Sequence, residues 1–241
     1  MEILVLSLLA GLATTFGGLL VVIQPSFSEK ALAALLGGAG GVMAGVVLLD
    51  LLPSAWKLGG FAAAVEGFSL GILFIFLLDR LFSFFMPASQ GERNSFYLLN
   101  MGYLIAVGIA LHDLPEGIAI AVGYAAESQL GLILVVAIAL HNIPEGMATA
   151  APLLMGGMSS KRIIIINGIV SLFTPMGTII GLMLLKISPQ LIALLLATAA
   201  GAMTYIVRFE LIPESRRRHP NYSLLGVFIG IVLSTMLAIA H

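Results

Sequence analysis

The sequence predicts an all-α, polytopic membrane protein in which eight transmembrane helices form one domain over residues 1–241. The chain of 241 residues is 60% hydrophobic and only 10% charged, with a mean hydropathy of +1.11. Its apolar runs reach about twenty residues or more, which is long enough to cross a bilayer. Short connections rich in Gly, Pro, Ser and polar residues separate these runs. A lipid bilayer is therefore the expected surrounding of the protein.

The predicted spans follow the chain in order, with boundaries placed to within about 2–4 residues. The first run begins almost at Met1 and carries Glu2 where a signal peptide would carry basic residues, so we expect a retained helix. The chain contains no cysteine, which excludes disulfides and thiolate metal ligands. No basic patch with interleaved aromatic residues occurs, so no nucleic-acid partner is expected. The spans cover residues 3–23, 31–52, 61–79, 97–125, 130–154, 162–186, 189–213 and 222–240.

The distribution of Lys and Arg predicts the orientation of the chain. The connections after the first, third, fifth and seventh spans hold eight basic residues, whereas the opposite connections hold Lys57 and Lys186. Because the more basic side faces the cytoplasm, both termini are predicted to be extracytoplasmic. The compact form favours the inner (plasma) membrane of a bacterium. The eight basic residues are Lys30, Arg80, Arg93, Lys161, Arg162, Arg216, Arg217 and Arg218.

One phrase occurs twice inside apolar runs: residues 112–117 read HDLPEG, and residues 141–146, 29 positions later, read HNIPEG. Ionisable residues within a membrane span are costly, so such a cluster indicates a functional site. A single intramembrane His is often only a hydrogen-bonded helix contact. Two copies with identical spacing argue strongly against that simpler interpretation.

The spacing within the phrase predicts a metal site. At about 100° per residue, Asp113 lies about 100° and Glu116 about 40° around the helix from His112. Two facing helices would thus offer imidazoles on one side, Asp113 and Asn142 on the other, and carboxylates between them, as in a bridged two-metal site. Imidazole and carboxylate suit zinc, iron, manganese, cobalt or nickel and argue against a copper(I) carrier. The second helix supplies His141, Asn142 and Glu145.

Each phrase also contains a helix-breaking proline. Pro115 and Pro144 lack an amide hydrogen, so the carbonyls of Leu111 and Leu140 lose their helical partners and both helices are expected to kink. A freed carbonyl in hydrocarbon must find a side chain, water or an ion. Broken helices near the middle of the membrane are where transporters tend to hold their ions.

A second repeat relates the two ends of the chain. Residues 43–53 and 203–213 resemble each other at an offset of 160, which also aligns residues 11–14 with residues 171–174. Five crossings separate the copies, so the copies must run in opposite directions. Spans one to three and six to eight therefore predict inverted repeats around two central helices, a 3+2+3 arrangement typical of transporters.

Three residues on the repeats are further candidates. Symmetry places Asp50 near the external end of the second span and Glu210 near the cytoplasmic end of the seventh, where they could relay cations to and from the centre. The alternative is local pairing, for instance of Glu210 with Arg208 or Arg80. Met43 could add a thioether ligand, although methionine at such a position more often serves packing.

These residues resemble the ZIP family of divalent metal transporters over essentially the whole chain. The resemblance rests on the paired phrases on the fourth and fifth helices, the eight spans and the inverted repeat. It implies inward transport of zinc, iron, manganese, cobalt or cadmium, homodimers, and an elevator-like movement of the metal-bearing helices. It also implies one ion held by His112, Glu116, His141 and Glu145, with Met43 at a matching position, and a second held by Asp113 and Asn142, which share Glu116 and Glu145.

The chain departs from the family pattern at one position of the sixth helix. Bacterial members often carry Glu-Pro-Leu-Gly there, whereas this chain has Thr-Pro-Met-Gly at residues 174–177. Losing that carboxylate predicts a second site that is weaker, more hydrated or occupied by a different ion. Asn167, Ser171 and Thr174 share one helix face and are candidates for neutral oxygen ligands. The family's histidine-rich cytoplasmic loop is absent.

The sequence thus predicts a non-enzymatic importer of divalent transition-metal cations, with Zn²⁺ first and Fe²⁺, Cd²⁺, Mn²⁺ and Co²⁺ as further substrates. The competing interpretation is an intramembrane di-metal carboxylate enzyme, because paired carboxylates and histidines also occur in di-metal helix bundles. Those bundles favour Glu-x-x-His spacing, and an intramembrane protease would need His-Glu-x-x-His. Neither spacing fits these phrases, and the inverted repeat favours transport.

Overall fold

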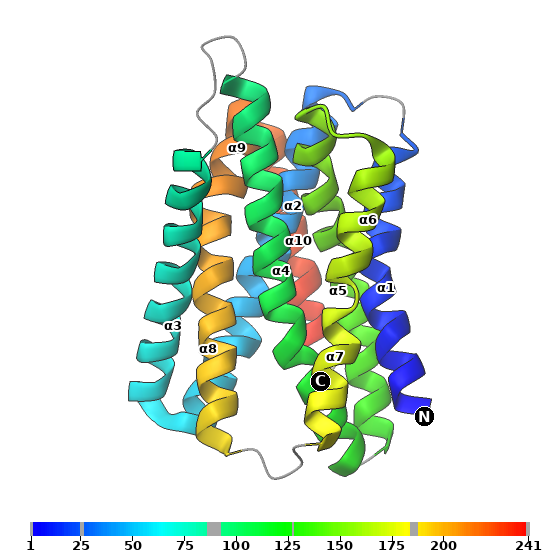
Figure 1. Cartoon of the computed structure of the whole chain (residues 1–241), viewed down its shortest axis with the longest axis vertical. Coiled ribbons are helices and arrows are strands. Elements are labelled where there is room, and N and C mark those ends of the chain that lie inside the picture. Colours follow the sequence, from blue (N-terminus) through cyan, green and yellow to red (C-terminus); the bar gives the residue numbers. More distant parts are fainter. Residues whose placement is uncertain (1, 25–26, 86–92, 127, 184–187, 240–241) are drawn as a thin grey trace.

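The computed structural model describes residues 2–24, 27–85, 93–126, 128–183 and 188–239, and each element within these ranges is helical. The predicted all-α class is confirmed. Most helices run along the long axis of the molecule (Figure 1). The elements are α1 (Glu2–Val22), α2 (Glu29–Val46), the π-helix η1 (Val47–Leu51), α3 (Leu52–Phe85), α4 (Arg93–Ala126), α5 (Ser128–Met155), α6 (Ser160–Val170), α7 (Phe173–Met183), α8 (Pro189–Ile206), the π-helix η2 (Val207–Leu211), α9 (Ile212–Arg218) and α10 (Pro220–Ile239).

Six helical stretches among the described residues are long and apolar enough to cross a membrane, and Pro220–Met236 is a shorter apolar helix. One of the six, Glu29–Leu81, has 53 residues. A straight helix of that length would measure about 80 Å, far more than the roughly 30 Å of hydrocarbon. Gly60 interrupts it with φ of 76°, and α2 descends while α3 ascends in Figure 1. Glycine is suited to this reversal because it has no Cβ to oppose positive φ.

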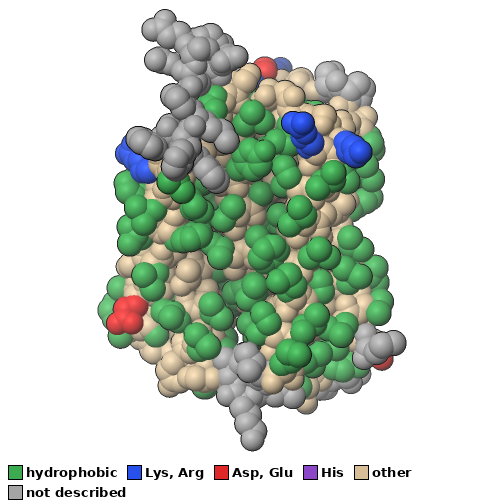
Figure 2. Space-filling view, viewed as in Figure 1, with side chains coloured by type: hydrophobic (Ala, Val, Ile, Leu, Met, Phe, Trp, Pro, Cys, Tyr) green, Lys and Arg blue, Asp and Glu red, His purple; other side chains and the backbone are tan. Residues whose placement is uncertain are grey.

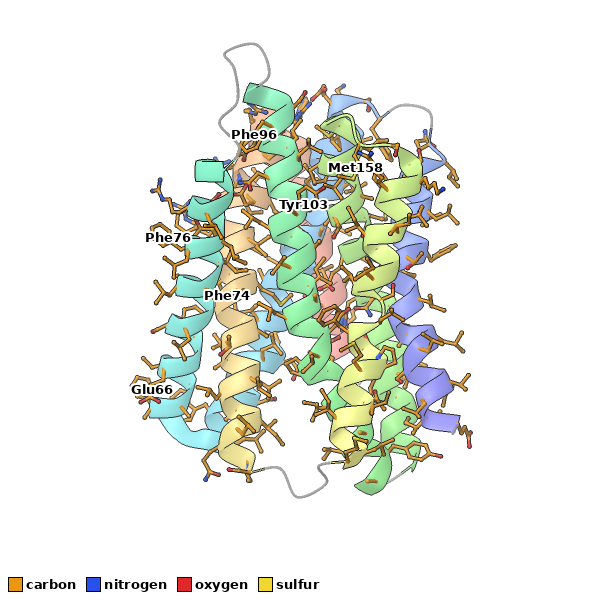
Figure 3. The ribbon with its side chains drawn as sticks, in the orientation of Figure 1. Glu66, Phe74, Phe76, Phe96, Tyr103 and Met158 are labelled. Atoms are coloured by element: carbon orange, nitrogen blue, oxygen red, sulfur yellow. The ribbon has the colours of Figure 1, made fainter. Side chains whose placement is uncertain are left out.

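The surface fits a lipid environment. Hydrophobic side chains cover the middle of the face in Figure 2, and Lys and Arg lie near its upper end. Figure 3 shows Phe74, Phe76 and Glu66 along α3 at the edge of the molecule. The large side chains of Trp56 and Phe61 are 61% and 66% exposed. In a bilayer these apolar surfaces contact lipid, and the protein is a multi-pass membrane protein.

The helices pack as two bundles. The motif bundle, which carries both HxxPEG phrases, comprises α1, α4, α5, α6 and α7. The flanking bundle comprises α2, η1, α3, α8, η2, α9 and α10, with α3 against α8 and α10 against α2. In Figure 1, α3 and α8 lie to the left and α1, α5, α6 and α7 to the right.

Glycines bring helices together within each bundle. A Cβ on Gly146 or Gly117 would collide with the backbone of α1 or α7, and one on Gly71 would collide with α8. Between the bundles, the close glycine contact is that of Gly108 with the end of the Ile206 side chain. Helix backbones therefore pack closely within each bundle, whereas side chains fill the contact between the bundles.

The structure reproduces the offset of 160 in two ways. Residues 2–23 and 162–183 have the same order of buried, intermediate and exposed positions. The π-helices Val47–Leu51 and Val207–Leu211 lie at the same offset. In Figure 1, α1 ascends while α6 and α7 descend, and α2 descends while α8 ascends.

Two predicted spans differ from the observed helices in detail. The span predicted at 162–186 is divided, because a turn at Ser171 and Leu172 separates α6 from α7. Pro175 has no N–H to donate to the Ser171 carbonyl, which removes the helical bond across that turn. The connection expected between Arg80 and Phe96 is shorter, since α3 continues to Phe85 and α4 begins at Arg93. Lys186, used in predicting orientation, lies outside the described residues.

Candidate metal site

The two phrases meet at one carboxylate. Glu116 Oε1 lies 2.7 Å from His112 Nε2 and 2.8 Å from His141 Nε2. The two imidazole centroids are 5.8 Å apart. One ligand atom from each of these residues lies within 4.8 Å of the others, and the side chains are buried. This separation allows a single metal ion to contact all three ligands.

The site contains polar atoms without protein partners. Neither His Nε2 forms a hydrogen bond of acceptable geometry among the described residues, in spite of the short distances to Glu116. Both oxygens of Glu145 and both of Asp113 are likewise without partners, and these two side chains are fully buried. Such groups are costly to bury unsatisfied, so the donor set fits a bound cation.

Glu145 and the residues after each His extend the cluster. Glu145 lies on α5, and its Oε1 is 3.9 Å from His112 Nε2 of α4. Asn142 donates from Nδ2 to the Ala10 carbonyl at 3.1 Å, which leaves its Oδ1 without a partner. Asp113 contacts Thr174 of α7. The structure therefore brings His112, Glu116, His141 and Glu145 together between α4 and α5, while Asn142 contacts α1.

Neighbouring helices fix the two phrases in place. Thr178 of α7 donates to the Gly117 carbonyl at 3.0 Å, and Asn167 of α6 donates to the Gly146 carbonyl at 3.2 Å. Both α4 and α5 remain helical through their prolines. These hydrogen bonds reach carbonyls two residues after each proline, so neighbouring helices hold the backbone of both phrases in place.

A cavity of about 540 Å³ leads from the surface to this cluster. Glu116 and His141 line its inner part, and Asp50, Ser54 and Lys57 line its other end. Ser54 donates to Asp50 at 3.2 Å, and Asp50 is exposed. The site is therefore accessible from the end of the molecule where η1 and Gly60 lie.

Glu210 occupies the opposite end, in η2. Its side chain is 5% exposed, and its Oε2 has no partner among the described residues. It contacts Tyr97 of α4 rather than forming the local ion pair with Arg208 or Arg80 weighed above. Asp50 and Glu210 thus lie at equivalent positions of the repeat, one exposed and the other buried.

Comparison with known proteins places the chain in a family. Residues 96–240 match the family model described as ZIP zinc transporter. The zinc transporter ZupT of Corynebacterium glutamicum is 36% identical, over 97% of this chain and 98% of that protein. ZupT of Chlorobium chlorochromatii is 34% identical, over 95% of this chain and 93% of that protein. ZupT of an Enterobacter species is 35% identical, over 95% of this chain and 92% of that protein.

The chain belongs to the ZIP zinc transporter family. The resemblance predicted from the paired phrases is confirmed, and membership agrees with the prediction that the protein is not an enzyme. The name given to the relatives describes carriage of an ion rather than its chemical conversion.

In this ZIP-family protein the remaining predicted ligands have different surroundings. Met43 is fully buried in the main apolar cluster. Thr174 and Asn167 are fully buried, and each has an oxygen without a partner. Ser171 lies 2.7 Å from the Thr15 hydroxyl, so its hydroxyl is already engaged.

Sequence reasoning missed Thr14 as a candidate ligand. Its side chain is fully buried, and its hydroxyl has no partner among the described residues. The offset of 160 places it at the position equivalent to Thr174. That repeat was the available signal: a polar residue proposed in one copy should have been considered in the other.

Proposed function

We propose that this protein imports divalent transition-metal cations, with Zn²⁺ as the principal substrate. The supporting observation is the buried convergence of His112, Glu116 and His141 at the inner part of a one-sided cavity. Two nitrogen ligands and carboxylate oxygen suit zinc, and an open coordination position would leave room for water or exchange. The names of the relatives support the same substrate. Fe²⁺, Cd²⁺, Mn²⁺ and Co²⁺ are further proposed substrates, which the same donors can bind.

We further propose a second, weaker cation position beside the first. Asp113, Asn142 and Glu145 offer oxygens without partners, and Thr174 adds a neutral hydroxyl where the family resemblance implies a carboxylate. Thr14 and Asn167 are neutral candidates nearby, while Ser171 is a weaker one because it contacts Thr15. Neutral oxygens bind divalent ions less strongly than carboxylates, which favours a hydrated ion here.

The proposed route follows the long axis. Eight crossings in a 3+2+3 inverted repeat, with both termini extracytoplasmic, would place Asp50 at the entrance and Glu210 at the exit. The cation would bind from the cavity, and movement of the motif bundle against the flanking bundle would then expose it to the cytoplasm. Met43 is proposed to face the ion from the flanking bundle during this movement. Two copies would form a homodimer, as the family resemblance implies.

Metal uptake into proteoliposomes tests the proposal. The purified protein is reconstituted, and influx of Zn²⁺, Cd²⁺, Fe²⁺ and Mn²⁺ is compared for the unchanged chain, Glu116→Ala and His141→Ala. Each substitution removes one of the converging ligands, so we expect saturable influx to fall at least about tenfold. Glu66→Gln is the matched control, since Glu66 is an exposed carboxylate on α3 at the edge of the molecule (Figure 3) and does not line the cavity.

Saturable influx lost in both site variants and retained in Glu66→Gln would support transport through the cluster. Stoichiometric metal binding without flux of any tested ion would contradict transport. Equal loss in the Glu66→Gln control would show that the assay responds to general damage rather than to the site.

A further inference from the structure

Polar contacts connect the two bundles at the end opposite the cavity. Asn100 of α4 donates from Nδ2 to Asp79 Oδ1 of α3 at 2.9 Å. Tyr97, nearly one turn earlier on α4, contacts Glu210 of η2 and lies 5.9 Å beneath the guanidinium of Arg217 in α9. We name the Asn100–Asp79 hydrogen bond the polar tie.

The polar tie is partly buried, and its acceptor is held in position. Asn100 is 8% exposed, so its hydrogen bond is shielded from water. The Tyr205 hydroxyl of α8 donates to the other carboxylate oxygen, Asp79 Oδ2, at 3.1 Å. Tyr205 and Asp79 belong to the same bundle, whereas Asn100 belongs to the other. One carboxylate therefore receives one hydrogen bond within its bundle and one across the boundary.

At the other end the same two bundles are separated by the cavity. Asp50, Lys57 and Ile192 of the flanking bundle line it on one side, and Glu116 and His141 of the motif bundle line it on the other. The molecule is thus joined by a charge-assisted hydrogen bond at one end and open at the other. The glycine contacts that lock backbones together lie within the bundles, so they do not fix this relative position.

We infer that the polar tie stabilises the conformation in which the metal cluster is accessible only from the Asp50 end. This inference rests on the proposed function, because the second conformation is the one that would release the ion to the opposite side. A partly buried hydrogen bond to a carboxylate is strong enough to shift such an equilibrium by roughly tenfold. Breaking it favours separation of α4 from α3 and α8.

Cysteine accessibility provides the test, because the natural sequence contains no cysteine. Two single-cysteine reporters are made, Ala119→Cys in the cavity lining and Leu104→Cys, which is fully buried one turn beyond Asn100. Each is combined with Asn100→Leu, which is close in size but cannot donate. The protein is placed in nanodiscs without metal, and the rate of modification by a hydrophilic maleimide is measured. We expect the Leu104→Cys rate to rise about tenfold and the Ala119→Cys rate to fall.

Tyr205→Phe is the matched control. It removes a hydrogen bond to the same Asp79 carboxylate but leaves the contact between the bundles intact. Each cysteine reporter combined with Tyr205→Phe should therefore be labelled at a rate within about twofold of the same reporter without Tyr205→Phe. Asn100→Ala serves as a second variant should Asn100→Leu fail to give a monodisperse protein.

Unchanged Leu104→Cys labelling in the Asn100 variants would overturn the inference, as would an equal rise in Tyr205→Phe. The reporters measure conformation without transport, so the two proposals can fail separately. If the labelling rates shift as expected but the protein shows no metal flux, the inferred role of the polar tie is supported and the proposed import function is rejected. If metal flux is normal and the labelling rates do not change, the inferred role of the polar tie is rejected and the proposed import function is supported.

Discussion

Both imidazoles converge on Glu116, and metal binding at the proposed site should be sensitive to acid because imidazoles take up protons. A protonated imidazole cannot ligate a metal, so protons and cation compete for His112 and His141. We expect Zn²⁺ to bind at least about tenfold more weakly at about pH 5.5 than at about pH 7.5. Equilibrium dialysis at the two pH values measures this change. An affinity independent of pH would exclude the imidazoles as ligands.

Thr174 tests the second cation position at the scale of one side chain. Thr174→Glu would replace a neutral hydroxyl with a carboxylate beside Asp113. We expect bound Cd²⁺ to rise from about one to about two ions per chain, because an added carboxylate attracts a divalent cation more strongly than a neutral hydroxyl does. Inductively coupled plasma mass spectrometry after gel filtration gives the stoichiometry.

Thr174→Val is the control for that substitution, since it keeps the shape and removes the hydroxyl. It should leave the stoichiometry at about one or weaken the second ion further. A stoichiometry of two in the unchanged chain and in Thr174→Val would mean that Thr174 has no part in the second position.

At the scale of helices, close glycine contacts hold the phrases against α1 and α7. A Cβ on Gly146 would collide with the Thr14 carbonyl, so Gly146→Ala must displace a backbone. We expect a loss of about 1–3 kcal/mol of stability, which lowers the midpoint of thermal unfolding by several degrees. Thermal unfolding in detergent, followed by circular dichroism, measures the midpoint.

Gly168→Ala is the matched control on α6, because nothing lies within 4 Å of its added Cβ. Alanine there should leave stability unchanged or raise it by about 0.5–1 kcal/mol, as expected for a helix interior. A similar loss in both variants would contradict the assigned role of the Gly146 contact.

The helices and the cluster of His112, Glu116 and His141 were predictable because their signals are local. Apolar runs gave α1, α4, α5 and α10 nearly to their ends, and helical spacing placed His112 and Glu116 on adjacent faces. The π-helices were not predictable, because an extra residue in a helical turn leaves no distinctive composition. The hydrogen bond from Asn100 to Asp79 depends on tertiary packing between residues 21 positions apart, which no helical period encodes.

At the scale of the whole molecule, orientation is the prediction that remains to be tested. The positive-inside distribution predicts that Lys57 faces the exterior and Lys161 the cytoplasm. In intact cells an impermeant maleimide should label Lys57→Cys and should reach Lys161→Cys only after permeabilisation. Labelling in the reverse order would place the cavity on the cytoplasmic side and would contradict the proposed entrance at Asp50.

The one-sided cavity also determines where a membrane voltage acts. A cavity open to solvent carries little of the voltage drop, so most of the drop falls across the packed half between the metal cluster and Glu210. A divalent cation crossing the full drop at about 100 mV changes its energy by about 4.6 kcal/mol. Most of that energy would be gained while the bundles move and little while the ion binds. A negative interior should therefore accelerate translocation and leave the affinity for external metal nearly unchanged.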